Sequence, residues 1–211
     1  MGRWSGMRRG RELELSLFGA GPSPEDPAYR KNLAEILSAD TLRVSEKIKT
    51  GETIPGPQKS KAFGELHRRK NKLVKLISEH QESDFDPENP PKDFLRELRI
   101  NLIEGLGLPD EETDRIKAYS AIGTPLDTIA GIDSFFIIRE KEGEYCITID
   151  GSARQKNPDE IKAHIFVKDE PPDPNEDWDG YIKTINLYTA KIMDKLNELR
   201  TKRETLDKTL N

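Results

Sequence analysis

The chain has 211 residues and a formal net charge of −5, with 34% hydrophobic and 35% charged residues. This length fits one good-sized domain with helical additions, and the low apolar fraction means that the core must come from a few segments. The acidic balance excludes a globally basic surface, so any contact with nucleic acid would need a local basic patch.

Cysteine usage and the absence of long apolar runs predict a cytoplasmic protein. The single cysteine, Cys146, excludes an internal disulfide framework and fits a reducing compartment. No apolar run approaches the roughly 20 residues that span a bilayer. The basic start also lacks the apolar centre of a signal peptide. We therefore expect no membrane partner.

Residues 1–20 predict a basic arm followed by a short strand at the edge of a sheet. Arginines gather before residue 12, and Leu13, Leu15 and Leu17 then alternate with polar residues. Alternation with a period of two is typical of a strand with one buried face.

Residues 21–82 predict a helical region that ends in a basic helix. The part from Lys59 to Lys75 holds seven basic residues and one acid. Such a helix could follow a phosphate backbone, or it could be an ordinary solvated surface helix with an apolar stripe. The residues that we predict to bind nucleic acid are Arg68, Arg69 and Lys72.

Residues 83–92 form an acidic, proline-rich linker, and residues 93–211 predict an α-β-β-β-α core. The expected elements are helices over 93–105 and 110–122, strands over 132–140, 144–152 and 163–168, and a long helix from Tyr181. The first two strands must be antiparallel because their connection is too short for a crossover. We predict an α+β fold, in which helices flank a small antiparallel or mixed sheet.

Two aspartates mark the ends of the expected hairpin. Asp133 lies about nine residues before the turn, and Asp150 lies about eight residues after it. Residues equidistant from a hairpin turn lie opposite each other, with Cα atoms about 4.5–5.5 Å apart. The two aspartates should therefore end near the same edge of the sheet. Whether they share a face depends on the register.

Two opposed acids favour a bound cation. Like charges directly opposite each other destabilise a strand pair unless a cation lies between them. Mg²⁺, or Mn²⁺ in its place, suits such a site because it takes one or two carboxylates and fills its other positions with water and phosphate oxygens. There it would act as a Lewis acid in phosphodiester cleavage.

The order of these elements resembles the PD-(D/E)XK nuclease superfamily, whose core is α-β-β-β-α-β. The resemblance covers about residues 93–200 and implies a metal-dependent endonuclease. By it, Asp133 would be the first metal-binding acid and Asp150 the second. Asp127 is a second candidate for the first acid.

This chain departs from the family pattern two residues after the second acid, where Ser152 stands in place of lysine. The resemblance allows the lysine to come from elsewhere, and Lys156 or Lys168 would then supply it. The family also often places an acid on the first helix. By the resemblance, Glu112 or Glu104 would fill that role, with Glu112 as the predicted third metal ligand.

Other interpretations stay open from the sequence alone. Asp150 and Gly151 are a common turn pair, so the aspartates could simply terminate strands. A nuclease-like fold without catalysis, acting as a binding module for nucleic acid or protein, is a second hypothesis. A third is a homodimer through the C-terminal helix, whose apolar stripe is Tyr181, Ile185, Tyr188, Ile192, Leu196 and Leu199.

Overall fold

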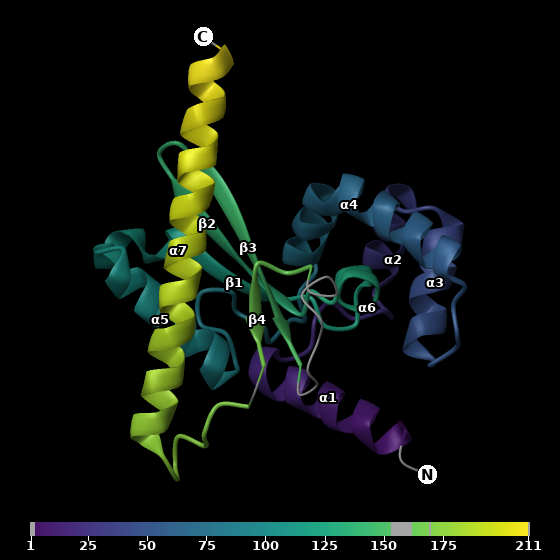
Figure 1. Cartoon of the computed structure of the whole chain (residues 1–211), viewed down its shortest axis with the longest axis horizontal. Coiled ribbons are helices and arrows are strands. Elements are labelled where there is room, and N and C mark those ends of the chain that lie inside the picture. Colours follow the sequence, from purple (N-terminus) through teal and green to yellow (C-terminus); the bar gives the residue numbers. More distant parts are fainter. Residues whose placement is uncertain (1–2, 153–161, 169, 211) are drawn as a thin grey trace.

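The computed structural model confirms an α+β fold (Figure 1). It describes residues 3–152, 162–168 and 170–210, and side chains between residues 11 and 209 within these ranges. The elements in chain order are α1 (Arg3–Phe18), α2 (Pro27–Ile36), α3 (Ala39–Lys49), α4 (Gly56–Glu79), α5 (Asp93–Gly105), the 3-10 helix η1 (Asp110–Arg115), β1 (Ile116–Ser120), α6 (Pro125–Ala130), β2 (Ser134–Glu140), β3 (Gly143–Gly151), β4 (Ile165–Val167) and α7 (Trp178–Leu210).

The strands form one four-stranded mixed sheet in the order β1-β2-β3-β4. The first three strands are antiparallel neighbours, and β4 is parallel to β3. The turn between β2 and β3 is tight, with Glu140 paired to Gly143. The predicted hairpin is therefore confirmed.

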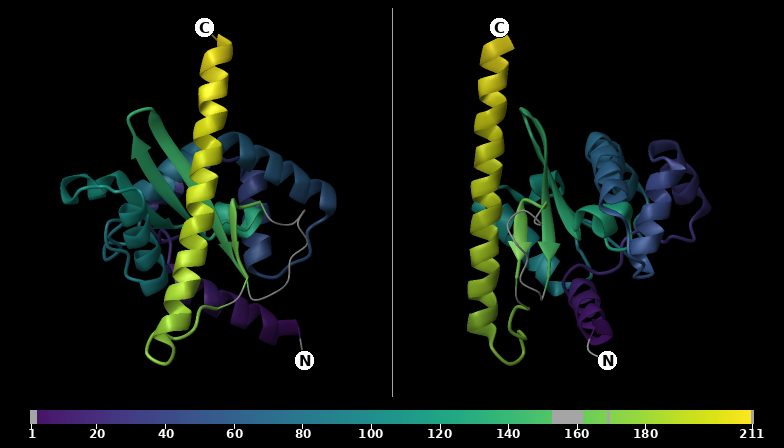
Figure 2. Two further views of the ribbon diagram at one scale, coloured as in Figure 1. Left: turned by 60° about the vertical axis from the view of Figure 1, so that its left-hand side comes forward. Right: turned by 45° about the vertical axis from the view of Figure 1, so that its right-hand side comes forward.

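Each face of the sheet packs against different helices (Figure 2). On one face, Phe136, Ile138 and Ile147 belong to a core with α1, α5 and α7. On the other face, Phe135 and Ile137 pack with α2, α3, α4 and α6. Burial on both faces explains why β2 carries four consecutive apolar residues, Phe135 to Ile138, rather than apolar residues at alternate positions.

The predicted strand near the N-terminus is wrong, because these residues form the end of α1. Leu13 and Leu17 are four residues apart and both are buried, with Phe18 beside them. Alternate leucines fit a strand, but positions 13 and 17 also fit one face of a helix. Packing against the core selected the helix.

The helix predicted over residues 110–122 is also wrong. Its first part is η1, and the rest is the edge strand β1. Ile116, Ala118 and Tyr119 are buried between the sheet's two helical layers. The acids at the start are typical of a helix N-terminus, but here they lead only into a short 3-10 turn.

The stripe of α7 packs within the chain. Five of its six residues are buried against the sheet and α5, and Leu199 packs partly buried beside them. The C-terminal turns of α7 extend beyond the sheet (Figure 1). In the part of the chain that the structure describes, none of the helices combines the length and apolar character of a membrane span.

A carboxylate from α4 stabilises the start of α3. Glu65 Oε1 accepts a hydrogen bond from the backbone N–H of Ser38 at 2.8 Å, and Oε2 accepts from Ser38 Oγ at 2.6 Å and Thr41 Oγ1 at 2.5 Å. Burial acts to raise the pKa of Glu65, but the hydrogen bonds from Ser38 and Thr41 outweigh it and hold the pKa below its usual value.

We predict that Glu65→Gln lowers the free energy of unfolding by about 1–2 kcal/mol at pH 7, because an amide offers a single acceptor and no charge. The loss should shrink as pH falls through the lowered pKa of Glu65, since the wild-type carboxylate is then protonated as well. Urea unfolding at pH 7 and pH 3 measures both effects. Glu79→Gln, which removes an exposed acid from the same helix, should change stability by less than about 0.5 kcal/mol. An equal loss in both variants would contradict the prediction.

Candidate metal centre

The hairpin brings Asp133 and Asp150 to the same end of neighbouring strands. Ser134 of β2 pairs with Ile149 of β3. Asp133 comes directly before Ser134 and Asp150 comes directly after Ile149, so both aspartates lie at the same end of the hairpin. The side chain of Asp133 is 2% exposed and that of Asp150 is 1% exposed. The N–H of Gly151 donates a hydrogen bond to Asp133 Oδ2 at 2.7 Å, which ties the first aspartate to the residue after the second.

Asp133 belongs to a group of three acids that we call the acidic cluster: Glu14, Asp127 and Asp133. One ligand oxygen from each lies within 4.8 Å of the others. Glu14 comes from α1, Asp127 from α6, and Asp133 from the segment that enters β2. Asp150 is not a member of this group.

Local sequence explains how α6 carries Asp127 into the cluster. Thr124 caps the helix by accepting a hydrogen bond from the N–H of Leu126, and Pro125 occupies the first helical turn. Gly131 ends α6 in the left-handed conformation, with φ of 63°, which allows the chain to turn sharply toward Asp133. The N–H of Gly123 donates to Asp127 Oδ2 at 2.7 Å and fixes that carboxylate.

The pKa of Asp133 is raised well above its usual value. Burial is the main cause, followed by the negative charges of Asp127, Glu14 and Asp150, while the Gly151 N–H acts in the opposite direction. A buried carboxyl among three other acids is costly to ionise without a compensating positive charge. A divalent cation bound at the cluster would supply that charge.

Arg11 already places one positive charge beside the cluster. Its Nη1 atom lies 2.8 Å from Asp127 Oδ2 and 3.5 Å from Glu14 Oε2. These ion pairs join α1 to α6. Within the described residues Asp133 itself forms no ion pair, so Arg11 directly offsets the charge of the other two acids only.

The remaining predicted site residues lie elsewhere or outside the described residues. Lys156 falls outside them. Ser152 is buried, and its N–H donates to the carbonyl of Val167 at 2.9 Å. Lys168 is exposed just after β4. Glu112 lies in η1 and forms an ion pair with Arg115.

The helix acid of the acidic cluster is Glu14, and Glu112 and the exposed Glu104 are not members of this group. Sequence reasoning missed Glu14 because its segment was interpreted as a strand. A signal was present, because Glu14 stands between Leu13 and Leu17, whose spacing also fits the buried face of a helix.

Cys146 does not supply a reactive thiol. It lies in β3, and burial raises the pKa of its thiol to about 11. The thiolate needed for nucleophilic attack is therefore scarce at neutral pH.

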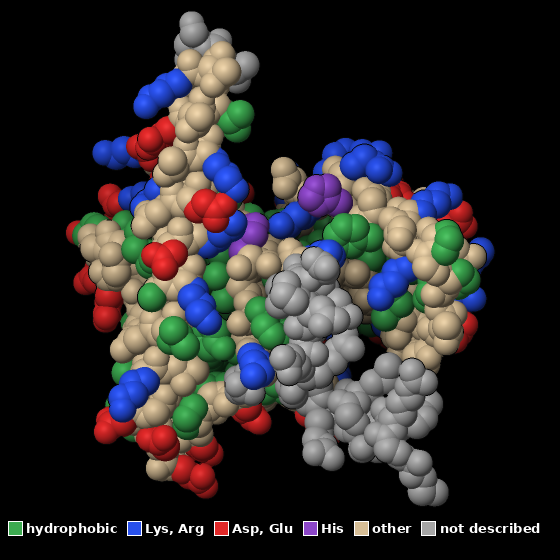
Figure 3. Space-filling view, viewed as in Figure 1, with side chains coloured by type: hydrophobic (Ala, Val, Ile, Leu, Met, Phe, Trp, Pro, Cys, Tyr) green, Lys and Arg blue, Asp and Glu red, His purple; other side chains and the backbone are tan. Residues whose placement is uncertain are grey.

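The basic residues predicted on α4 face solvent. Arg68, Arg69 and Lys72 are exposed. Arg68 acts electrostatically on Glu65 of the same helix. Figure 3 shows Lys and Arg side chains gathered over α4. Their position leaves this basic surface free to contact an anion.

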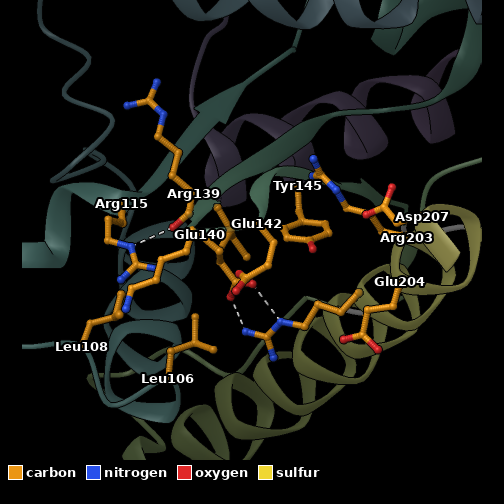
Figure 4. Close-up of a pocket in the computed structure, with 13 residues that line it drawn as sticks. Leu106, Leu108, Arg115, Arg139, Glu140, Glu142, Tyr145, Arg203, Glu204 and Asp207 are labelled. Carbon is orange, nitrogen blue, oxygen red and sulfur yellow. Dashed lines mark hydrogen bonds and ion pairs between the residues drawn. The ribbon is translucent and has the colours of Figure 1, made fainter. Parts of the chain in front are cut away.

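A separate pocket of about 470 Å³ lies between the β2–β3 turn, α5 and α7 (Figure 4). Two of the arginines that line it are held by hydrogen bonds. Arg200 Nε donates to Glu140 Oε2 at 3.0 Å, and Arg115 Nε donates to the carbonyl of Arg139 at 2.8 Å. No member of the acidic cluster lines this pocket.

Comparison of the chain with protein-family models, curated proteins and solved structures found no match. The acidic cluster, the order of the strands and the basic surface of α4 are therefore the observations from which a function can be argued.

Proposed function

We propose that this protein hydrolyses phosphodiester bonds of nucleic acid with a divalent metal, Mg²⁺ or Mn²⁺, bound at the acidic cluster. The observation that carries the proposal is the convergence of Glu14, Asp127 and Asp133 from three separate segments. Its support is strengthened by the burial of Asp133, because a buried acid among acids is retained at a cost to stability.

The order of elements also supports a nuclease like those of the PD-(D/E)XK superfamily. Helix α5 precedes three antiparallel strands, Asp133 stands directly before β2, and Asp150 lies at the end of β3. Along the chain, these are the positions that the resemblance gives to the two metal-binding acids, although Asp150 is not a member of the acidic cluster. In our proposal Asp150 acts beside the cluster through its charge, which already acts on Asp133.

Backbone N–H groups would hold the metal-binding carboxylates in place. Asp133 is held in place by the Gly151 N–H through Oδ2, which leaves Oδ1 as the candidate ligand atom. Asp127 is held by the Gly123 N–H. A bound Mg²⁺ would polarise the phosphoryl oxygen and lower the pKa of a bound water. Because the metal needs the carboxylate form, its binding should displace a proton from Asp133.

A catalytically inactive binding module is the second candidate function. The observation that favours it is Ser152, whose neutral side chain stands where the resemblance places a lysine. In that case the basic surface of α4 would bind nucleic acid without metal-dependent cleavage. Dimerisation through α7 would need residues other than its buried stripe, for example Leu187 or Leu206, which are exposed.

Cleavage assays on the full chain test the proposed function. Supercoiled plasmid and end-labelled single-stranded DNA and RNA are incubated with Mg²⁺, with Mn²⁺ or with EDTA. We expect cleavage of at least one substrate that requires the metal and stops in EDTA. Metal-independent cleavage, or none with any substrate, would overturn the assignment, and binding without cleavage would favour the inactive module.

We predict that Arg11→Gln tightens Mn²⁺ binding about fivefold, because removing one nearby charge is worth about 1 kcal/mol at a partly solvated site. Isothermal titration calorimetry measures the affinity. The ion pairs of Arg11 are partly exposed, so unfolding free energy should fall by less than about 1 kcal/mol. Arg30→Gln, which removes an exposed arginine on α2, is the charge-matched control. Unchanged or weaker binding in the Arg11 variant would contradict the prediction.

A further inference from the structure

The surface between α4 and α7 contains an incomplete sheet edge. β3 pairs with β2 from Gly143 to Ile149 but with β4 only from Ile149 to Gly151. His164, the residue before β4, extends the pairing with β3 by one residue, to Thr148. Its N–H donates to the carbonyl of Thr148 at 3.0 Å, and its Nδ1 accepts from the N–H of Thr148 at 3.2 Å. The hydrogen bond to Nδ1 thereby fixes the ring of His164 at this edge of the sheet.

Positive side chains lie on both sides of this ring. Lys70 of α4 and Lys195 and Lys202 of α7 all act electrostatically on His164. Figure 3 shows Lys or Arg and His side chains following one another from α4 across the strand ends to α7. We call this surface the basic trough and define it by Lys70, His164, Lys195 and Lys202.

One acid, Glu198, also acts on His164, and it is held by Lys195 at 2.8 Å and by Lys202 at 2.5 Å. These two hydrogen bonds lower the pKa of Glu198 to about 2, so it is ionised at any physiological pH. Three lysines against one glutamate leave the basic trough with a net positive charge.

His164 adds a neutral donor to this surface. Burial, together with the lysines, lowers the pKa of His164 to about 4, so the ring is uncharged at pH 7. Because Nδ1 accepts the Thr148 hydrogen bond, the ring hydrogen belongs on Nε2. The basic trough therefore offers ammonium groups and an N–H donor, which are the groups that bind phosphate oxygens.

A ring pair on α4 lies at the α4 side of the trough. His67 is exposed and stacks on Phe63, with ring centroids 6.4 Å apart and an interplanar angle of 23°. The ammonium of Lys162 lies 5.8 Å from the centroid of Phe63. An exposed ring beside cations can stack an unpaired base, whereas the bases of a duplex are already stacked on each other.

We infer that a single nucleic-acid strand binds along the basic trough, with its phosphates against Lys70, Lys195 and Lys202 and a base on His67. This inference rests on the proposed function for its ligand class and adds that the substrate is single-stranded. It also assigns the strand's path to the space between α4 and α7, rather than to the outward surface of α4 at Arg68, Arg69 and Lys72.

Fluorescence anisotropy with a labelled single-stranded 20-mer of mixed sequence tests the inference, in EDTA so that nothing is cleaved. The trough variant is Lys70→Gln/Lys195→Gln/Lys202→Gln. We expect it to bind at least tenfold more weakly than wild type and to reduce the salt slope by about 2, since each lost phosphate contact on a single strand contributes about 0.7. His67→Ala should weaken binding of the single strand by about fivefold or more.

Two matched triple variants complete the design. Lys31→Gln/Lys183→Gln/Lys208→Gln removes the same charge from exposed lysines elsewhere and should bind like wild type. Arg68→Gln/Arg69→Gln/Lys72→Gln tests the outward surface of α4. Full affinity in the trough variant, or an equal loss in all three triple variants, would overturn the inference.

The probes also separate the ligand classes. Tighter binding of a 20-base-pair duplex, or full competition by poly-glutamate at equal charge, would overturn the assignment to a single nucleic-acid strand. Full affinity in the trough variant, together with metal-dependent cleavage by wild type, would contradict the inference alone. Weakened binding in the trough variant, without any cleavage by wild type, would contradict the proposed function alone.

Discussion

Asp133→Asn is expected to reduce metal-dependent cleavage by at least about a thousandfold, because it removes the charged ligand at the centre of the acidic cluster. The amide has the shape of the carboxylate, and its oxygen can still accept the hydrogen bond from the Gly151 N–H. The fold should therefore persist. Unfolding free energy without metal should be equal to or higher than that of wild type, since a buried acid among like charges is removed.

Rates of cleavage by wild type and variants, measured in Mg²⁺ and in Mn²⁺, test this prediction. Glu112→Gln is the matched control, because Glu112 is an acid outside the cluster whose partner is Arg115. It should retain near-wild-type activity. Asp150→Asn should reduce activity less than Asp133→Asn, because Asp150 acts from beside the cluster. Full activity in Asp133→Asn together with a stable fold would contradict the site assignment.

The second large effect is a loss of stability in mild acid that depends on His164. The folded protein holds the pKa of His164 at about 4, mainly through burial and then through Lys70 and Lys195. The unfolded chain takes up a proton near pH 6.5. The free energy of unfolding should therefore fall as pH is lowered from about 6.5 to 4. The pKa difference corresponds to about 3 kcal/mol if fully expressed. The ring is only partly buried, so we expect about 1–2 kcal/mol.

His164→Asn should remove this component, since asparagine does not titrate and its oxygen can take the place of Nδ1 opposite the Thr148 N–H. Urea unfolding of wild type and His164→Asn at intervals from pH 7 to pH 4 measures the difference in their free energies of unfolding. The aspartates and glutamates are the same in both proteins, so their titration cancels in this difference. His67→Asn, which removes an exposed histidine of α4, is the matched control. The same pH dependence in wild type and His164→Asn would contradict the prediction.

The hairpin and its two aspartates could be predicted from the sequence because they depend on local features. A two-residue turn fixes which residues lie opposite each other, and the apolar runs fix the strands. The helices α4, α5 and α7 were likewise expected, because their apolar stripes are long and regular.

The parts of the site that the sequence did not reveal depend on long-range packing. Glu14 approaches Asp133 because α1 packs against the sheet. The two residues are far apart in sequence, so no short sequence motif predicts this contact. The strand β1 was not predicted, because the acids of η1 directly before it are typical of the start of a helix. The basic trough joins side chains more than 90 residues apart in sequence, Lys70 from α4 with His164 and the lysines of α7.

Anomalous diffraction from a crystal soaked in Mn²⁺ tests the central claim most directly. The proposed function predicts a peak at the acidic cluster, about 2.0–2.4 Å from an oxygen of Asp133 and from an oxygen of Asp127 or Glu14. The same soak of Asp133→Asn should lose the peak. Absence of a peak at the cluster in wild type, or strong peaks only at other acids, would contradict the account.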